Sequence, residues 1–202
     1  MTLLHLAAEE GTVKIIKFFL NSLKEHEEIL KSLVEATTTI HYYKNPTALH
    51  LAAAGGYLDV VQCLVKHGAD VNIKSDYNET VLHYAVQGNK LDVVQWLVEH
   101  EKANVEDTDK YGMTVLHYAV QGNKLDVVQW VVEHGKANVE ATDKYGMTVL
   151  HWAAQENELD VVQWLVEHGK ANVEATDNDG KTPLNLAKER KRKKITEYLK
   201  KR

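Results

Sequence analysis

A block of twenty residues that returns almost unchanged along the chain is the feature that most constrains its fold. The block VLHYAVQGNKLDVVQWLVEH occupies Val81–His100. Close or more distant copies occupy Val115–His134, Val149–His168 and Ala48–His67, and partial copies begin at Thr2 and Thr182. The threonines that open the copies are 45, 33, 34, 34 and 34 residues apart. A repeat of this length predicts a stack of similar structural units.

Each copy has the pattern of two short antiparallel helices. A threonine such as Thr114 is a suitable N-cap for the first helix, because its hydroxyl can satisfy a free amide of the first turn. The pair Gly122-Asn123 ends that helix, since both residue types tolerate a positive φ. The second helix carries Asp126 in its first turn and His134 in its last, as the helix dipole favours. Its apolar residues cover too wide an arc for an isolated helix, so neighbouring copies must bury them.

Residues Thr47–Asn72 read TALHLAAAGGYLDVVQCLVKHGADVN and resemble the ankyrin repeat almost position for position. The T-P-L-H-x-A motif of that family appears at Thr47–Ala52 and again at Thr182–Ala187. The resemblance implies an all-α ankyrin-repeat solenoid of stacked helix-turn-helix units with short β-hairpin-like links. It also implies a single domain over residues 1–202. Its expected units are 1–45 with a helical insertion, 46–79, 80–113, 114–147, 148–181 and a C-terminal cap at 182–202.

Two further features concern the helices of these units. An apolar stripe at helical spacing lies in the insertion, which predicts either an extended second helix or an added short one. The stripe consists of Ile29, Leu30, Leu33 and Val34. Large apolar residues also recur in the middle of the second helices, and we expect them in the core between units. They are Trp96, Trp130 and Trp164, with Phe18 and Cys63 at the same position in the earlier units.

Two rows of histidines follow the repeat and invite comparison with a metal site. The rows are His50, His83, His117 and His151, and His67, His100, His134 and His168. Packed helices lie about 8–10 Å apart, whereas zinc-bound imidazoles must come within about 2.1 Å of one ion. We therefore expect no metal. The first row is predicted to tie adjacent units by hydrogen bonds, and the second to end helices.

The sequence contains no pattern typical of catalysis. It has no phosphate-binding loop, no dinucleotide fingerprint and no nucleophile–base constellation. Cys63 lies in the predicted core column and should be inert. An enzyme built from these units would need its chemistry spread over near-identical copies. We therefore predict that the chain is not an enzyme and that it uses no cofactor and no small-molecule substrate.

The polar links between units are the predicted recognition surface. Asp-x-x-Gly, as in Asp143–Gly146, suits a β-turn that projects a hairpin. In ankyrin-type proteins the hairpin tips and first helices form the concave binding face. The matching residues predicted to contact a partner protein are Tyr77, Glu79, Lys110, Tyr111, Met113, Gln121, Lys144, Tyr145, Met147, Gln155, Glu156, Asp179 and Lys181. The three tyrosines carry the strongest indication, because tyrosine is enriched at interface hot spots. The alternative is that their rings only stiffen the hairpins.

Charge is distributed unevenly along the chain. Residues 188–202 hold nine Lys or Arg and two Glu, a balance of +7, while the whole chain carries −5 and the remainder therefore −12. Three interpretations of this basic segment stay open: a solubilising cap of the last unit, a nuclear-import signal, or contact with an acidic partner or membrane surface. Because the rest of the stack is acidic, nucleic-acid binding is not favoured as the main role.

The predicted function is a protein–protein interaction module, acting as a scaffold, adaptor or inhibitor. The alternatives are a nuclear regulatory factor that uses the basic segment, or the targeting module of a larger enzyme or of a bacterial or viral host-directed effector. The chain opens directly on a repeat threonine, as a fragment would. With one cysteine, no long apolar run and no signal-peptide pattern, we expect a cytoplasmic or nuclear protein, or one in a host cytosol if it is secreted. We expect a monomer when it is alone.

Overall fold

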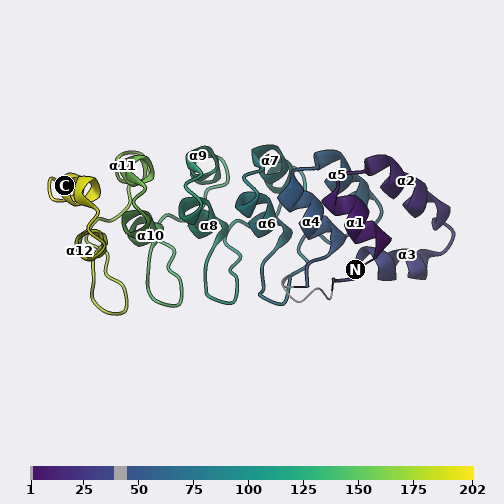
Figure 1. Ribbon diagram of the computed structural model, residues 1–202, viewed down its shortest axis with the longest axis horizontal. Helices are drawn as coiled ribbons and strands as arrows, with labels where there is room; N and C mark the ends of the chain where they lie inside the picture. Colours follow the sequence, from purple (N-terminus) through teal and green to yellow (C-terminus); the bar gives the residue numbers. More distant parts are fainter. Residues whose placement is uncertain (1, 39–44) are drawn as a thin grey trace. The chain divides into compact units, whose positions relative to one another are not determined.

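The structure, a computed structural model, describes residues 2–38 and 45–202 and is almost entirely helical in that part of the chain (Figure 1). Its helices are α1 (Leu3–Glu9), α2 (Val13–Ser22), α3 (Glu27–Val34), α4 (Ala48–Gly55), α5 (Leu58–Lys66), α6 (Val81–Gln87), α7 (Leu91–Glu99), α8 (Val115–Gln121), α9 (Leu125–Glu133), α10 (Val149–Glu156), α11 (Leu159–Glu167), α12 (Pro183–Glu189) and α13 (Lys193–Leu199). Two compact units, Met1–Asn104 and Val105–Arg202, divide the chain.

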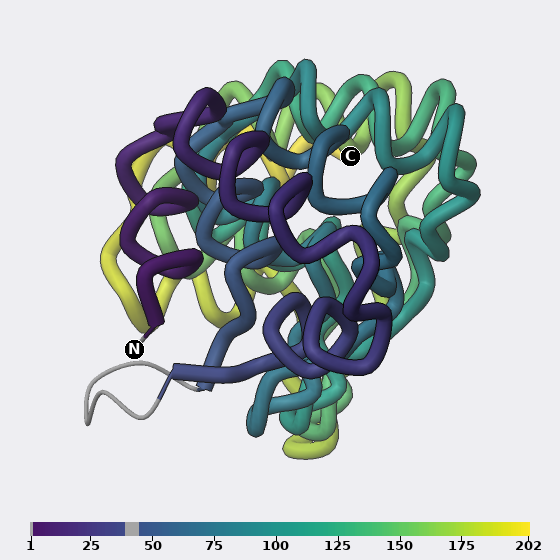
Figure 2. The backbone as a smooth tube through the Cα atoms, turned by 90° about the vertical axis from the view of Figure 1, so that its right-hand side faces the viewer, coloured from purple at the N-terminus to yellow at the C-terminus, as the bar shows by residue number. Residues whose placement is uncertain are grey.

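The described part of the first unit contains three helix pairs and one added helix. The first helices α1, α4 and α6 pack side by side, and the second helices α2, α5 and α7 form a row behind them. Helix α3 occupies the insertion, so of the two predicted alternatives the added short helix is the one present. Figures 1 and 2 both show α3 set apart from the α1–α2 pair, on the side of this unit where the hairpins lie.

The second unit repeats the same arrangement. Its first helices α8, α10 and α12 form one row, and its second helices α9, α11 and α13 form the other. In Figure 1 the hairpins extend from the first-helix row, away from the second helices. The predicted all-α fold of stacked helix-turn-helix repeats is therefore confirmed within each unit. Pairing between strands is confined, in the described residues, to isolated bridges such as Thr142 with Thr148.

The first helices begin at the threonines as predicted. At Thr148 the backbone N–H donates to Nδ1 of His151 (3.1 Å), and the threonine hydroxyl lies 2.8 Å from the same nitrogen. Since Nδ1 accepts, the proton of the neutral ring is on Nε2, which donates to the carbonyl of Lys181 at 3.0 Å. His117 makes the same bond to Met147. The predicted tie between successive repeats is confirmed for these histidines.

Burial explains why these rings stay neutral. The pKa of His50 is lowered to about 4, mainly because burial disfavours the charged imidazolium. Burial also lowers the pKa of His117 and of His151. The ring therefore acts as a fixed donor and acceptor, linking the start of its own helix to the hairpin that follows.

The turn between the two helices uses its glycine and asparagine differently. Asn89 and Asn123 take the positive φ, at 56° and 52°. Gly88 has an ordinary helical φ, but a Cβ there would lie 2.1 Å from the carbonyl oxygen of Ala54. Asparagine thus supplies the left-handed conformation, and glycine supplies the close approach between α4 and α6.

The extra residue of the 34-residue repeats is a lysine with positive φ. Lys136 has φ of 60°, and its Nζ donates to the carbonyl of Glu133 at 2.5 Å. Lys170 does the same to Glu167, at 3.3 Å. The extra lysine therefore satisfies a carbonyl that the end of the preceding helix leaves free.

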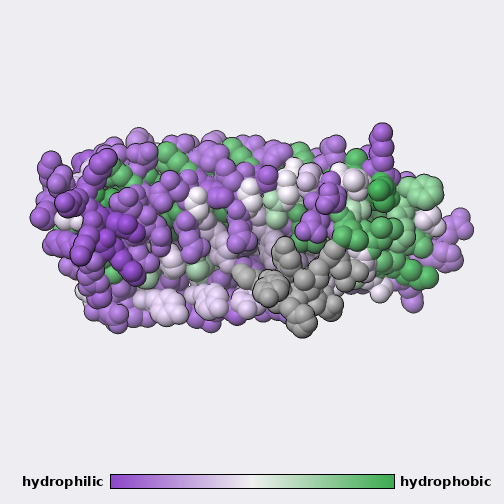
Figure 3. Space-filling view, in the orientation of Figure 1, coloured by the Kyte–Doolittle hydropathy of each residue, from purple (hydrophilic) through white to green (hydrophobic). Residues whose placement is uncertain are grey.

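One core prediction is wrong at the first repeat. Trp130, Trp164 and Cys63 are buried as expected and Trp96 is half-buried, but Phe18 is 79% exposed. None of the described helices packs against that side of α2, so its apolar residues face outward. Figure 3 shows the resulting hydrophobic area over α1–α3. The large exposed side chains there are Leu3, Leu6, Ile15, Phe18 and Ile29.

The basic C-terminal segment is folded as the last part of the second unit. It forms the end of α12 and all of α13, with Ile195 and Leu199 buried. Arg192 Nε donates to the carbonyl of Gln155 at 2.8 Å, and Arg202 pairs with Glu167 at 2.6 Å. These contacts support the interpretation of the segment as a cap.

Candidate functional site

The hairpins of the second unit are held by an aspartate at their base. Oδ1 of Asp143 accepts hydrogen bonds from the amides of Tyr145 (2.8 Å) and Met147 (2.9 Å). Asp109 and Asp177 make the same pair of bonds in their own hairpins. One carboxylate thus fixes two amides of each turn, which explains why the sequence repeats Asp at this point.

Successive hairpins are also bonded to one another. The amide of Lys144 donates to the carbonyl of Tyr111 at 2.9 Å, and the amide of Asn178 donates to the carbonyl of Tyr145 at 2.9 Å. The Asn178 side chain adds a bond to the carbonyl of Lys144 at 3.0 Å. The three hairpins of this unit therefore form a connected row whose backbone is fixed before any partner arrives.

Aromatic residues of the first helices, which are not among the predicted contact residues, complete this row. Trp152 Nε1 donates to Oδ2 of Asp143 (3.0 Å), and the hydroxyl of Tyr118 donates to Oδ2 of Asp109 (2.9 Å). In the first unit burial, followed by the Glu79 carboxylate, raises the pKa of Tyr84 above its ordinary range. An aromatic residue directly after His83, His117 and His151 was the available sign in the sequence.

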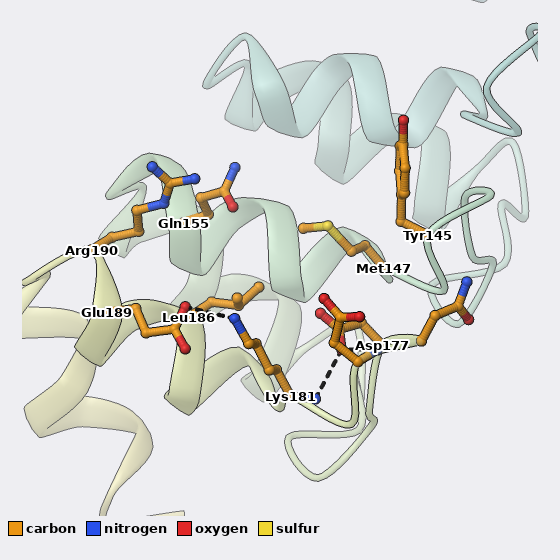
Figure 4. Close-up of a pocket in the computed structure, with 10 residues that line it drawn as sticks. Tyr145, Met147, Gln155, Asp177, Lys181, Leu186, Glu189 and Arg190 are labelled. Atoms are coloured by element: carbon orange, nitrogen blue, oxygen red, sulfur yellow. Dashed lines mark hydrogen bonds and ion pairs between the residues drawn. The ribbon is translucent and has the colours of Figure 1, made fainter.

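A hollow opens in the second unit where this aromatic residue is missing. Leu186 occupies the position of Trp152 in the last repeat and offers Asp177 no donor. The hollow measures about 470 Å³. Figure 4 shows Tyr145 and Met147 on one side of it, Glu189 and Arg190 on the other, and Lys181 between them. Its lining comprises Tyr145, Met147, Gln155, Asp177, Asn178, Asp179, Lys181, Leu186, Glu189 and Arg190.

The hollow combines charges of both signs with an aromatic rim. Lys181 Nζ lies 2.9 Å from Oε2 of Glu189, and this bond raises the pKa of the lysine. Asp179 and Arg190 are exposed on the same lining. Such a surface can donate and accept hydrogen bonds and cover an apolar side chain, as an interface requires. Among the described residues, no three His, Cys, Asp or Glu side chains are grouped closely enough to hold a metal ion.

The structure brings five of the thirteen predicted contact residues together in this hollow. They are Tyr145, Met147, Gln155, Asp179 and Lys181. Of the others, Gln121, Lys144 and Tyr111 are exposed, Lys110, Glu156 and Tyr77 are half-buried, and Lys110 Nζ lies 5.0 Å from the centre of the Tyr111 ring. The residues Tyr111 and Tyr145 are 43% and 61% exposed. Their ring surfaces are thus available to another molecule.

Two predicted contact residues are buried instead. Glu79 is 1% exposed, because its carboxylate turns inward and accepts a hydrogen bond from the Ser75 hydroxyl at 3.1 Å. Met113 is 7% exposed, and its amide is held by Asp109. In this structure neither side chain lies at the surface where the prediction placed it, and whether either residue contacts a partner stays a prediction.

Comparison with known proteins agrees with the repeat pattern. A family model described as ankyrin repeats (3 copies) matches residues 1–75, 49–143, 90–177 and 135–202, which together cover the chain. NF-kappa-B inhibitor alpha of Rattus norvegicus is 38% identical over 77 residues, 38% of this chain and 23% of that protein. The Homo sapiens protein of that name is 41% identical over 71 residues, 35% of this chain and 20% of that protein. The chain thus matches less than a quarter of the length of these relatives.

Proposed function

Because the chain belongs to the ankyrin repeat family, whose repeats are protein-interaction modules, we propose that it binds a partner protein through its hairpin side. The proposed contact surface in the second unit consists of the hairpin tips and the adjoining hollow. Its centre is the group Tyr145, Met147, Asp179 and Lys181. In the first unit Tyr77 belongs to the corresponding hairpin.

One observation carries this proposal: the exposed tyrosines stand on a backbone that is already fixed. Tyr145 has 61% of its surface exposed, while its amide and carbonyl are bonded to Asp143 and Asn178. A partner that covers this ring therefore orders little additional chain, and a rigid aromatic anchor is the usual centre of an interface. This favours binding over a purely stiffening role for the ring.

We further propose that binding is of an inhibitory kind, in which the chain occupies a surface that its partner needs. The support is the similarity to proteins named NF-kappa-B inhibitor alpha. NF-kappa-B is for that reason the first candidate partner to test. A single ankyrin domain over residues 1–202, a cytoplasmic or nuclear location and the absence of catalysis belong to the same proposal. No described helix is long and apolar enough to cross a membrane.

The test is the double variant Tyr111→Ala/Tyr145→Ala, compared with the unchanged chain for binding to purified NF-kappa-B or to a partner identified by affinity capture. We expect the dissociation constant to rise at least about a hundredfold, since hot-spot aromatics contribute about 2 kcal/mol or more each. The thermal midpoint should hardly change. A large fall in the midpoint with binding intact would assign the rings to stiffening instead.

The matched control is Gln129→Ala, a half-buried position on the second helix α9, which should leave binding unchanged. If this control weakens binding as much as the tyrosine variant does, then the hairpin side is not the contact surface.

A further inference from the structure

A second hollow, in the first unit, lies between the second helices α2 and α5. It measures about 540 Å³. Its lining comprises Lys17, Asn21, Lys24, Asp59, Gln62, Cys63, Lys66 and His67. Three of these residues are lysines and one is a carboxylate, although the chain as a whole is acidic. The lining is therefore positive, as is the C-terminal segment of residues 188–202.

The hollow coincides with a departure from the repeated sequence. At the position of Cys63 the three later repeats carry an indole, and each indole stacks on the histidine four residues further on. The stacked pairs are Trp96–His100, Trp130–His134 and Trp164–His168, with ring centres 5.5–6.0 Å apart. Cys63 is much smaller than tryptophan and leaves His67 without that stacking partner. Space opens where the other repeats are filled.

The charge changes at the same place. Lys66 occupies the position at which the later repeats carry Glu99, Glu133 and Glu167. Lys17 occupies the position of the glutamines Gln62, Gln95, Gln129 and Gln163. Lys17 and Lys66 thus add positive charge at the place where Cys63 leaves the space of a missing indole.

The thiol of Cys63 lies in the electrostatic field of two of these lysines. Burial raises the pKa of this thiol, while the positive charges of Lys17 and Lys66 act in the opposite direction. Both ammonium groups therefore exert their field at the same atom. A buried thiol with a raised pKa is a poor nucleophile, so the cysteine serves here as the floor of the hollow and not as a reactive group.

His67, at the end of α5, and Asn21 of α2 face each other across the hollow. The Nδ1–H of His67 donates to the carbonyl of Cys63 at 2.8 Å, which fixes the ring. Its Nε2 lies 3.4 Å from the side-chain oxygen of Asn21. The ring and the amide thus supply polar atoms beside the lysines, on a backbone that is already ordered.

We propose that this hollow binds a phosphate group, either free or carried as a monoester. A phosphate has three or four acceptor oxygens and nearly two negative charges, which match the three ammonium groups better than a single carboxylate would. Lysine suits such a ligand because it contacts phosphate as a compact charge. The hollow lies on second helices of the first unit and shares no residue with the hairpin hollow, so the proposal does not depend on the proposed function.

Titration of the full chain with two probes tests the proposal and distinguishes the source of the phosphate. The probes are inorganic phosphate and a short phosphoserine peptide with its unphosphorylated counterpart, and the readout is the amide shifts of residues 17–24 and 62–67 in NMR spectra. Saturable shifts with either phosphate probe support the site, and the stronger probe identifies the source. Binding should weaken when the ionic strength is raised. Unchanged spectra with both probes overturn the proposal.

The chain supplies its own matched variants. Cys63→Trp fills the hollow with the indole of the later repeats, and Lys66→Glu replaces an ammonium group with their carboxylate. Each should weaken phosphate binding at least about tenfold, which for Lys66→Glu is the order of one lost charge-assisted hydrogen bond. Lys14→Glu changes an exposed lysine of α2 outside the hollow and should have little effect. Circular dichroism confirms that the variants are folded. Phosphate binding that survives in both Cys63→Trp and Lys66→Glu contradicts the proposal, as does an equal loss in Lys14→Glu.

Discussion

The two hollows arise in the same way in different units of the molecule. On the hairpin side of the second unit, Leu186 stands where the preceding repeat has Trp152, and Asp177 loses its indole donor. On the second-helix side of the first unit, Cys63 stands where later repeats have tryptophan. In both regions a large aromatic residue of the repeat is replaced by a smaller one. Residues that the repeats share form the packed scaffold of each unit. The two substitutions by smaller residues leave the hollows.

The chemistry of the two regions differs. The hairpin hollow has an exposed tyrosine at its rim and charges of both signs, as protein interfaces have. The second-helix hollow has three lysines, one carboxylate and no exposed aromatic ring. The same kind of helical repeat therefore carries a surface with charges of both signs in the second unit, which suits a protein. In the first unit it carries a positive surface, which suits an anion.

The largest effect on the free energy of unfolding should come from a substitution in the packed core. Leu150 is fully buried in α10, and Leu150→Ala should lower the free energy of unfolding by about 2–5 kcal/mol, because it leaves a cavity. Chemical denaturation measures the change. Exposed Tyr145→Ala is the companion variant, and it should change the free energy of unfolding by less than about 0.5 kcal/mol. If the two variants lose the same free energy of unfolding, the distinction between core residues that stabilise the repeats and surface residues that bind a partner is wrong.

The next effect is a loss of stability in mild acid. His50 has its pKa lowered to about 4 by burial, whereas the unfolded value is 6.5. Above pH 6.5 the ring is neutral in both states, and its contribution to stability is fully present. As the pH falls from 6.5 to about 4, only the unfolded state binds the proton, so stability falls by up to about 3 kcal/mol.

Denaturation curves between pH 7 and 4 check this expectation, with His50→Asn as the control. Asparagine is the residue that the last repeat carries at this position, where Asn185 Oδ1 accepts from the Thr182 amide at 2.9 Å. The variant should show a shallower dependence on pH over that window. An unchanged slope would mean that His50 is not the titrating group.

How far the sequence predicts the structure depends on whether a feature lies within one repeat. The threonine cap and the histidine tie follow from a motif that every central copy shares, and the structure contains both. The bond from Trp152 to Asp143 joins residues nine positions apart on different elements, so periodicity alone did not indicate it. The burial of Glu79 was missed because its partner Ser75 stands where the later hairpins carry Asp109 and Asp143, so the repeat pattern gave no sign of the contact.

The repeat pattern also gives every copy the same environment, and the edges break that assumption. Phe18 lies in the column of Trp130 and Trp164, but none of the described helices covers its side of α2, so it is exposed. Sequence equivalence identifies which residues share a position. It does not identify which copies have a neighbour to bury that position.

A smaller effect is expected from refilling the hairpin hollow. Leu186→Trp places an indole where Trp152 lies in the preceding repeat and can give Asp177 the missing donor. We expect the free energy of unfolding to rise by about 1 kcal/mol, the net contribution of one hydrogen bond. Thermal denaturation measures this change. A clear loss of stability would show that the last repeat cannot adopt the geometry of the preceding one.

The smallest effect should come from the inserted lysines. Lys136→Gly relieves the positive φ of 60° but removes the bond to Glu133 and loosens the unfolded chain. These contributions oppose one another, so the change should stay within about 0.5 kcal/mol. A loss well above that value would give the lysine bond a larger role in the packed scaffold than its exposure suggests.

Hydrogen exchange, measured on the chain with and without its bound partner, shows whether the hairpin side binds a protein. We expect slower exchange at residues 143–147 and 177–181 in the complex, with little change in the second helices α9 and α11. Slower exchange confined to α9 and α11, with the hairpins unaffected, would contradict the proposal.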